Sequence, residues 1–407
     1  MIGKISTMDY TPDIKIYAPD KYVQDVRARI KDIQTARSPS VVRVENGTVW
    51  PVGKPRKHGV YDACGQFVAA SNIVIRATAH PHAIHHAVKR YIDDDVLFLG
   101  NLHHHFGHVL LERLTRAWAL LSDKYKNMKC VIVYNSAADN IPEYYLEFLA
   151  ALGVARENIM VIKQPTRFRN VYVPELSKGP SFTTDAFAKT FDAIANSVPD
   201  NDAKYDCVYV SRDALRLRRT FGERAVQSVF QKNGFHVIYP ETMPIQQQIA
   251  IVKNCRVLAG CAGTALHLAL FMRPGGTVIQ IKRNSKNSDN ADQQFLVDKT
   301  KGLNSVFVWA SAESRPTEHF TPAPQIIGIG KYMQKFMDDF GLQYTHADTV
   351  ISASEWAAYE NAWREYRRAN SLWHRIKHAL VKILACAVPG RDNRAAFRNY
   401  MKRVMGV

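Results

Sequence analysis

The sequence predicts an α/β protein of two domains followed by a helical tail. Its 407 residues suffice for two domains of ordinary size, and 46% apolar against 22% charged residues is the balance of a globular chain. Apolar strand-like runs alternate with helical stripes, as in parallel sheets covered by helices. Lys and Arg exceed Asp and Glu by 17, so we expect an anionic partner: nucleic acid, anionic lipid or nucleotide-sugar phosphates.

The first domain is expected over residues 1–200. Residues 1 to about 60 hold many turn residues and are interpreted as an irregular lead-in. Strands and helices then alternate, and an apolar stripe marks the helix of 107–121. The expected strands are 60–65 (with its turn), 94–100, 129–134 and 158–162, and the expected helices are 107–121 and 142–152. Residues 163–203, with several prolines, are interpreted as the transition between domains.

The second domain is expected over residues 201–345, with the same alternation. Its expected strands are 207–211, 236–239, 256–260 and 277–281, and its expected helices are 224–233, 245–253 and 266–272. Residues 346–370 are interpreted as a helix that returns to the first domain, and residues 371–407 as a basic amphipathic tail.

A small-residue turn, Cys261-Ala-Gly-Thr-Ala265, separates strand 256–260 from the following helix. Small residues let a ligand approach the backbone, and a helix start offers N–H groups to a phosphate. The turn therefore predicts a nucleotide-type ligand in the second half of the chain.

Arginines follow the strand that ends at Tyr209-Val-Ser-Arg212. Guanidinium groups at a strand's carboxyl end clamp a diphosphate with forked hydrogen bonds. Arg212 is favoured because it lies nearest the strand end, with Arg216, Arg218 and Arg219 behind it; a solvated basic loop is the alternative. Glu241, after the strand of 236–239, would bind a ribose or base, or cap a helix.

Four histidines occur in Asn101-Leu-His-His-His-Phe-Gly-His108. If the next helix starts early, His104, His108 and Glu112 lie along one stripe. Three interpretations stay open: a zinc site, an acid–base site in which Glu112 orients His108, or structural histidines. The zinc interpretation would fit a zinc-dependent hydrolase, and the charge alone would fit a nucleic-acid-binding protein. The chain shows no zinc-finger spacing and no aromatic strand typical of RNA binding.

Several ordered segments resemble the family 61 glycosyltransferases, the DUF563-type group of bacterial polysaccharide biosynthesis. The matches cover roughly residues 60–285 and are Asn101 with His104, Tyr209–Arg212, Gly234–Glu241, Gly260 with Gly263, and Leu270–Ile281. The resemblance implies a GT-B-like fold, two Rossmann-like domains facing across a cleft. It also implies inverting transfer from a nucleotide sugar, expected to be a UDP-sugar, with no cofactor and no obligatory metal.

The resemblance also implies residue roles. The family's usual Asp after the first block is His108 here, so the base is His108 or Glu112, with His104 nearby. Asn101 and His105 are expected on the acceptor side. The donor would contact the second domain through Arg212, Arg218, Arg219, Glu241, Gly260, Gly263, Thr264 and His267.

The tail bears on location. Residues 372–407 hold eight Lys or Arg against one acid, Asp392, beside an apolar helical stripe. This pattern suits an anionic membrane surface, and a helical hairpin packed on the protein is the alternative. The N-terminus lacks a signal-peptide core, no apolar run would span a bilayer, and the six cysteines are scattered. We therefore expect a cytoplasmic enzyme attached to the inner face of the membrane, building capsule or lipopolysaccharide on a saccharide or lipid-linked acceptor, without nucleic acid.

Overall fold

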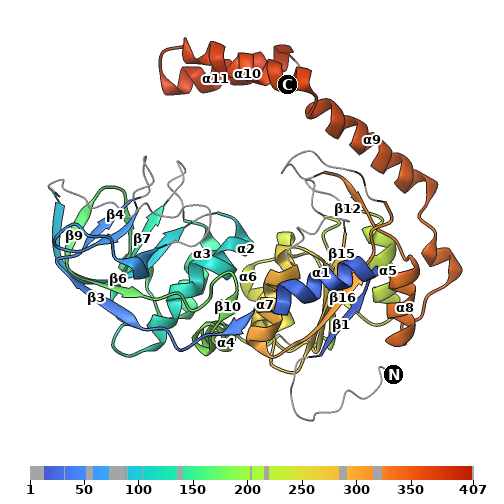
Figure 1. The fold of residues 1–407 in the computed structure, drawn as a ribbon, viewed down its shortest axis with the longest axis horizontal. Helices are drawn as coiled ribbons and strands as arrows, with labels where there is room; N and C mark the ends of the chain where they lie inside the picture. Colours follow the sequence, from blue (N-terminus) through green and yellow to red (C-terminus); the bar gives the residue numbers. More distant parts are fainter. Residues whose placement is uncertain are drawn as a thin grey trace.

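The computed structural model describes residues 13–31, 33–51, 58–72, 88, 90–102, 104–134, 141–201, 204–214, 220–283, 291–313, 315 and 323–405. Two large β-sheets organise them (Figure 1). The first sheet has seven strands: β3 (Val41–Glu45), β4 (Thr48–Trp50), β5 (Gly59–Tyr61), β6 (Arg90–Leu102), β7 (Lys129–Tyr134), β8 (Ile159–Ile162) and β9 (Thr166–Pro174). Strands β6 to β9 pair in parallel, whereas β3, β4 and β5 pair antiparallel.

The second sheet has six strands, and every neighbouring pair is parallel. Its order is β1 (Ile14–Tyr17), β16 (Asn304–Trp309), β15 (Thr277–Lys282), β14 (Val257–Cys261), β11 (Cys207–Val210) and β13 (His236–Ile238). The chain runs from β11 outward to β13, then returns to the other side of β11 with β14. The direction of winding therefore reverses between β11 and β14, where open α/β sheets bind ligands.

Helices cover both sheets, as an α/β fold requires. The helices of the described residues are α1 (Asp20–Lys31), α2 (Phe106–His108), α3 (Glu143–Ala151), α4 (Asp185–Ser197), α5 (Glu223–Lys232), α6 (Ile245–Val252), α7 (Ala291–Lys301), α8 (Lys331–Asp339), α9 (Ala353–Ala369), α10 (Leu372–Cys386) and α11 (Arg391–Met405), of which α10 and α11 lie away from the sheets. Two further helical segments matter for the site: α2 continues as a π-helix, η2 (Val109–Arg113), and then as a 3-10 helix, η3 (Leu114–Leu121). After β14 the chain forms the 3-10 helix η6 (Thr264–Phe271). The predicted α/β class is confirmed.

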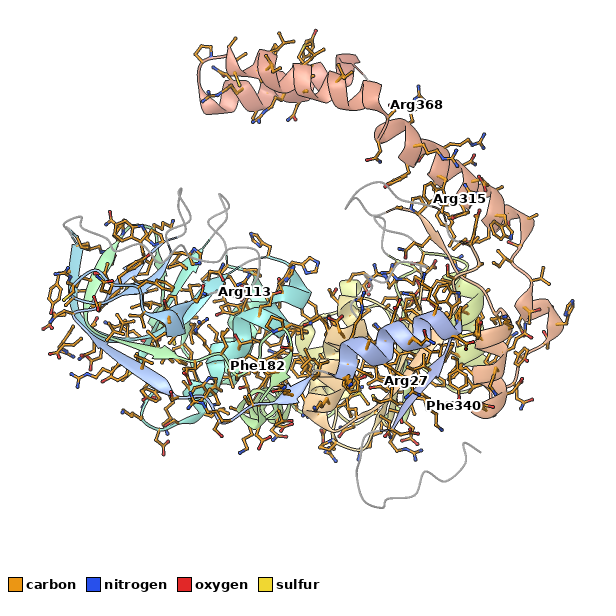
Figure 2. The ribbon with its side chains drawn as sticks, in the orientation of Figure 1. Arg27, Arg113, Phe182, Arg315, Phe340 and Arg368 are labelled. Atoms are coloured by element: carbon orange, nitrogen blue, oxygen red, sulfur yellow. The ribbon has the colours of Figure 1, made fainter. Side chains whose placement is uncertain are left out.

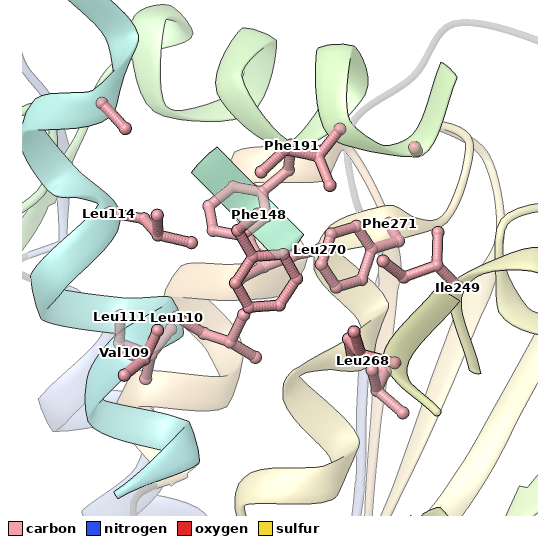
Figure 3. Close-up of a cluster of buried hydrophobic side chains, with 14 of the residues drawn as sticks. Val109, Leu110, Leu111, Leu114, Phe148, Phe191, Ile249, Leu268, Leu270 and Phe271 are labelled. Atoms are coloured by element: carbon pink, nitrogen blue, oxygen red, sulfur yellow. The ribbon is translucent and has the colours of Figure 1, made fainter. Parts of the chain in front are cut away.

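One apolar core joins the two sheets. Figure 3 shows side chains of η2 and α3 packed beside those of η6. Phe271 of η6 lies between aromatic rings from two other helices, with centroid distances of 5.9 Å to Phe148 and 5.4 Å to Phe191. These contacts bring the segment after β6 against the segment after β14.

Three segments differ from the sequence-based description. Residues 14–31, expected in the first domain, form β1 and α1, and β1 extends the second sheet beside β16. The stretch interpreted as transitional contains β9, which pairs with β3, β4 and β6. Helix α9, expected to return to the first domain, packs on two short strands of the second half, β12 (Thr220–Phe221) and β17 (Gln325–Ile326).

Candidate active site

Two parallel strands of the first sheet end at the same edge. Strand β6 ends at Leu102 and β9 ends at Pro174, and the two are paired neighbours. The chain after β6 carries the histidine-rich segment, and the chain after β9 carries Lys178. Parallel strands place their carboxyl ends together, so both segments reach one side of the sheet.

His108 and Glu112 form a close pair at this edge. His108 Nδ1 contacts Glu112 Oε1, and the His108 side chain is 31% exposed. The second carboxylate oxygen, Oε2, lies 3.2 Å from Arg113 Nη2, near enough for an ion pair but without hydrogen-bond alignment. Because a carboxylate accepts, Nδ1 is the donor of this contact, and Nε2 is the other ring nitrogen. Glu112 thus orients His108.

Buried arginines lie behind that pair. Arg113 Nη1 donates to Asn101 Oδ1 (Figure 2 labels Arg113), and burial lowers the pKa of Arg113 although Glu112 opposes the shift. Arg116 donates to the carbonyls of Ala70 (2.7 Å), Asn72 (2.8 Å) and Pro174 (3.0 Å), and burial lowers its pKa to about 9. Asn101 is 7% exposed. It therefore supports Arg113 and Glu112 from within the protein.

Lys178 reaches the same place from β9. Its ammonium group donates to Gln293 Oε1 of α7 at 3.0 Å and to the Gly179 carbonyl at 3.2 Å. Burial lowers its pKa to about 8, while Glu112 and Asp292 favour the charged form. Glu112, Arg113 and Lys178 line a cavity of about 20 Å³, which is room for about one water molecule.

On the second sheet, Arg212 lies where the winding reverses. It follows β11, and its Nη1 is 2.7 Å from the point that a Cβ atom on Gly263 would occupy. Gly263 follows the neighbouring strand β14, so the missing side chain makes room for the guanidinium group. Arg212 is 8% exposed, and its Nε has no hydrogen-bond partner among the described residues.

A buried carboxyl group and a second arginine accompany Arg212. Glu223 Oε1 accepts from the Arg212 backbone N–H at 3.0 Å. Burial raises the pKa of Glu223 to about 7, although Arg212 and Arg283 oppose the shift. Arg283 follows β15 and donates to Thr220 Oγ1 at 3.3 Å. This edge of the second sheet is therefore basic, which favours an anionic ligand.

The two edges meet at Gly107 and Thr264. A Cβ atom on Gly107 would lie 2.9 Å from Thr264 Cβ and 3.6 Å from His267 Cδ2. Gly107 precedes His108, and Thr264 follows Gly263. The His108–Glu112 pair therefore lies next to the turn after β14, and that turn lies next to Arg212.

His267 is held by a chain of buried hydrogen bonds. Its Nδ1 lies 3.0 Å from Gln294 Oε1, Gln294 Nε2 donates to Asp298 Oδ1 at 2.8 Å, and Ser305 Oγ donates to Asp298 Oδ2 at 2.6 Å. Burial lowers the pKa of His267 to about 4, and Lys178, His105 and His108 shift it the same way. The ring is therefore neutral near pH 7, with its proton on Nδ1 and an accepting Nε2.

The chain matches a family of known proteins. Residues 106–279 match the family model described as Glycosyltransferase 61, from α2 to β15. This part of the chain is a family 61 glycosyltransferase domain. The matched segment includes His108, Glu112, Arg212 and Gly263. None of the curated proteins compared with the chain matches it.

Most of the predicted site residues of the glycosyltransferase fall into four groups. His108, Glu112, Arg212, Gly263, Thr264 and His267 lie along the junction, with Asn101 behind them. Gly260 lies inside β14, where a Cβ atom would be 2.8 Å from the Val210 carbonyl, so it permits close strand packing. Glu241 is exposed in a short helical turn after β13 and caps no helix. Arg216, Arg218 and Arg219 lie outside the described residues.

His104, His108 and Glu112 do not form the helical stripe that the zinc interpretation requires. His105 is the N-cap of α2, so His104 precedes the helix, and its carbonyl accepts from Tyr144 Oη at 2.5 Å. His105 stays beside His108, with ring centroids 4.8 Å apart. Over the part of the chain that the structure describes, no three His, Cys, Asp or Glu side chains are placed to hold a metal ion.

Sequence reasoning missed several polar residues of the glycosyltransferase site, namely Arg113, Lys178, Glu223, Arg283 and Gln294. Arg113 had a local signal, because a charged residue falls on the apolar stripe of a Leu-rich helix. The others come from segments far apart in the sequence, and their contacts depend on the tertiary fold.

Proposed function

We propose that this glycosyltransferase is an inverting, GT-B-like enzyme that transfers a sugar from a nucleotide donor to a saccharide or lipid-linked acceptor of a surface polysaccharide. The observation that best supports this proposal is the close approach of Gly107 to Thr264. It brings the His108–Glu112 pair beside the turn that packs on Arg212. Capsule or lipopolysaccharide is the product class we expect, made at the inner face of the cell membrane.

In this mechanism His108 is the base. Nε2 takes the proton of the acceptor hydroxyl as its oxygen attacks the anomeric carbon, and Glu112 stabilises the imidazolium through Nδ1. The bond from the anomeric carbon to the diphosphate breaks, and the nucleoside diphosphate leaves with the electron pair. Attack opposite to the leaving group inverts the anomeric centre.

The leaving group needs positive charge or N–H donors. We assign this role to Arg212, the backbone N–H groups of the Gly263–Thr264 turn and, from the sequence, Arg218 and Arg219. Arg283 reinforces the same edge. Because guanidinium groups bind diphosphate bidentately, we expect transfer without an obligatory metal ion. A UDP-sugar is the donor to test first.

His267 has a different expected role. With Nδ1 donating to Gln294, Nε2 accepts a hydrogen bond instead of donating one. It therefore suits a sugar hydroxyl better than a phosphate oxygen. We expect it to orient the donor sugar or the acceptor.

The test is turnover with a panel of nucleotide sugars. His108→Ala should lower turnover about a hundredfold or more, because the base is lost while donor binding remains. Glu112→Gln should cost less, about tenfold, because it only orients the base. Arg212→Ala should weaken nucleoside-diphosphate binding as well as turnover.

A thermal-shift assay with nucleoside diphosphates separates binding from chemistry. His346→Ala is the matched control, since this histidine is exposed on a short helix of the second half, 346–349. A folded His108→Ala protein with the turnover of the control would remove the assignment of the base.

A further inference from the structure

The last two helices form a hairpin that stands apart from both sheets. Figure 1 shows α10 and α11 side by side, joined to the rest of the protein through α9. Val381 and Ala385, one helical turn apart on α10, are buried in the hairpin. The hairpin thus has its own small apolar interior.

A second apolar stripe on α10 faces outward. Ile376, Leu380, Ile383 and Leu384 are exposed, and their spacing places them on one side of the helix. Ile383 is 66% exposed, and Tyr400 adds an exposed ring on α11. Exposed apolar stripes of this kind usually mark an interaction surface.

Charge identifies the kind of partner. Residues 372–405 hold eight Lys or Arg residues and one acid. A partner for this surface must accept apolar side chains and carry negative charge. The interface of an anionic bilayer offers both, with acyl chains for the stripe and phosphates for the basic residues. None of the described helices has the length and hydropathy to cross a membrane.

Helix α9 is anchored near the proposed donor site. Glu355 Oε1 accepts from the Gly222 backbone N–H at 2.7 Å, and the next residue, Glu223, accepts from the Arg212 backbone N–H at 3.0 Å. Arg315 bonds Glu360 at 3.0 Å and lies over the rings of Tyr359 (5.2 Å) and Trp363 (5.5 Å). Figure 2 shows Arg315 beside α9 and Arg368 at the end from which the hairpin continues. The hairpin therefore extends from the donor-site side of the second sheet.

We propose that the α10–α11 hairpin docks on anionic lipid and holds the donor edge of the second sheet at the membrane surface, where a lipid-linked acceptor would be presented. The lipid docking stands on the hairpin alone. The presentation of an acceptor rests on the proposed transferase function.

Co-sedimentation of the full chain with vesicles tests the docking. We expect binding to vesicles that contain phosphatidylglycerol, weak binding to phosphatidylcholine alone, and release by salt. Leu380→Asn with Ile383→Asn should weaken binding on the order of tenfold, because two inserted apolar side chains are lost. Val350→Asn is the matched control, an exposed valine outside the hairpin. Circular dichroism confirms that each variant folds.

The outcomes separate this proposal from the proposed function. His108→Ala should bind vesicles as the unchanged protein does, so failed transfer and failed docking are distinct results. Equal vesicle binding by the double variant and the control overturns the docking. So does a dimer in solution that the double variant abolishes, because the stripe would then be covered by a second copy of the chain.

Discussion

At the scale of single residues, the site brings basic side chains close enough together to disfavour an added positive charge. His105, His108 and Lys178 all lower the pKa of His267, and burial lowers the pKa of Lys178 itself. A bound dianion would reverse that electrostatic cost. The arrangement therefore favours an anionic ligand, as the proposed nucleotide donor requires.

Asp298 supports the first prediction, on the pH dependence of stability. Burial raises its pKa from the ordinary 3.8 to about 7. Between these values the folded protein keeps a proton that the unfolded chain has lost, so the contribution of Asp298 to stability is full below the lower value and declines as pH rises to the upper one. Asp298→Asn stays neutral and can keep bonds to Gln294 and Ser305. It should therefore lack this decline, which amounts to a few kcal/mol.

Urea unfolding at a series of pH values measures the effect as the difference between parent and variant. The lowered pKa of His267 makes stability rise with pH, which is the opposite dependence. It affects both proteins alike, so it cancels from the difference between them. Glu157→Gln, at an exposed carboxyl group, is the control. A constant difference across the range would show that Asp298 does not titrate between its two pKa values.

At the scale of elements, the helical segment after β6 departs from a plain α-helix. The apolar stripe predicted a helix over 107–121, but the structure has one α turn, then η2 and then η3. A π segment changes the register of the side chains that follow it, and such segments are frequent at functional sites. Here Glu112 and Arg113 lie within it, with Glu112 against His108 and Arg113 against Asn101.

The sequence predicted what local periodicity encodes. The strands β7, β11 and β15 and the helices α3 and α6 have nearly the predicted bounds, because their apolar patterns match one period. The local sequence of a strand does not specify which strand it pairs with, so the pairing of β1 with β16 could not be predicted from periodicity. Lys178 and Gln294 were missed for the same reason. Each is an ordinary polar residue until the fold buries it.

The second prediction concerns the contact between α2 and η6. In Gly107→Ala the new methyl group would meet Thr264 Cβ at 2.9 Å, an atom next to the backbone that cannot swing aside. We expect a loss of about 1–3 kcal/mol in the free energy of unfolding, although alanine favours a helix over glycine. Turnover should fall as well, because Thr264 would be displaced beside the Gly263 turn.

Gly330→Ala is the matched control for this substitution. No heavy atom lies within 4 Å of its Cβ position, and its φ of −79° is ordinary for alanine. Chemical denaturation and a transfer assay on both variants make the comparison. Equal stability and turnover of the two would mean that the α2–η6 contact is looser than its geometry indicates.

At the scale of the whole molecule, the two sheets are coupled through one core. Residues from both sheets belong to the same apolar cluster, whereas Phe168 belongs to a separate cluster confined to the first sheet. The chain reinforces the coupling, since β1 and α1 pack with the second sheet before the chain enters the first. Sheets joined in this way should not unfold independently.

The third prediction tests that coupling. Phe271→Ala removes a ring that is 1% exposed and lies against Phe148 and Phe191, and should cost about 3–5 kcal/mol. Phe168→Ala removes a fully buried ring from the first sheet alone. If the shared core couples the sheets, each variant shifts one common transition in urea, seen equally by tryptophan fluorescence and circular dichroism. Two separate transitions, of which Phe168→Ala moves one, would show instead that the sheets unfold as independent domains.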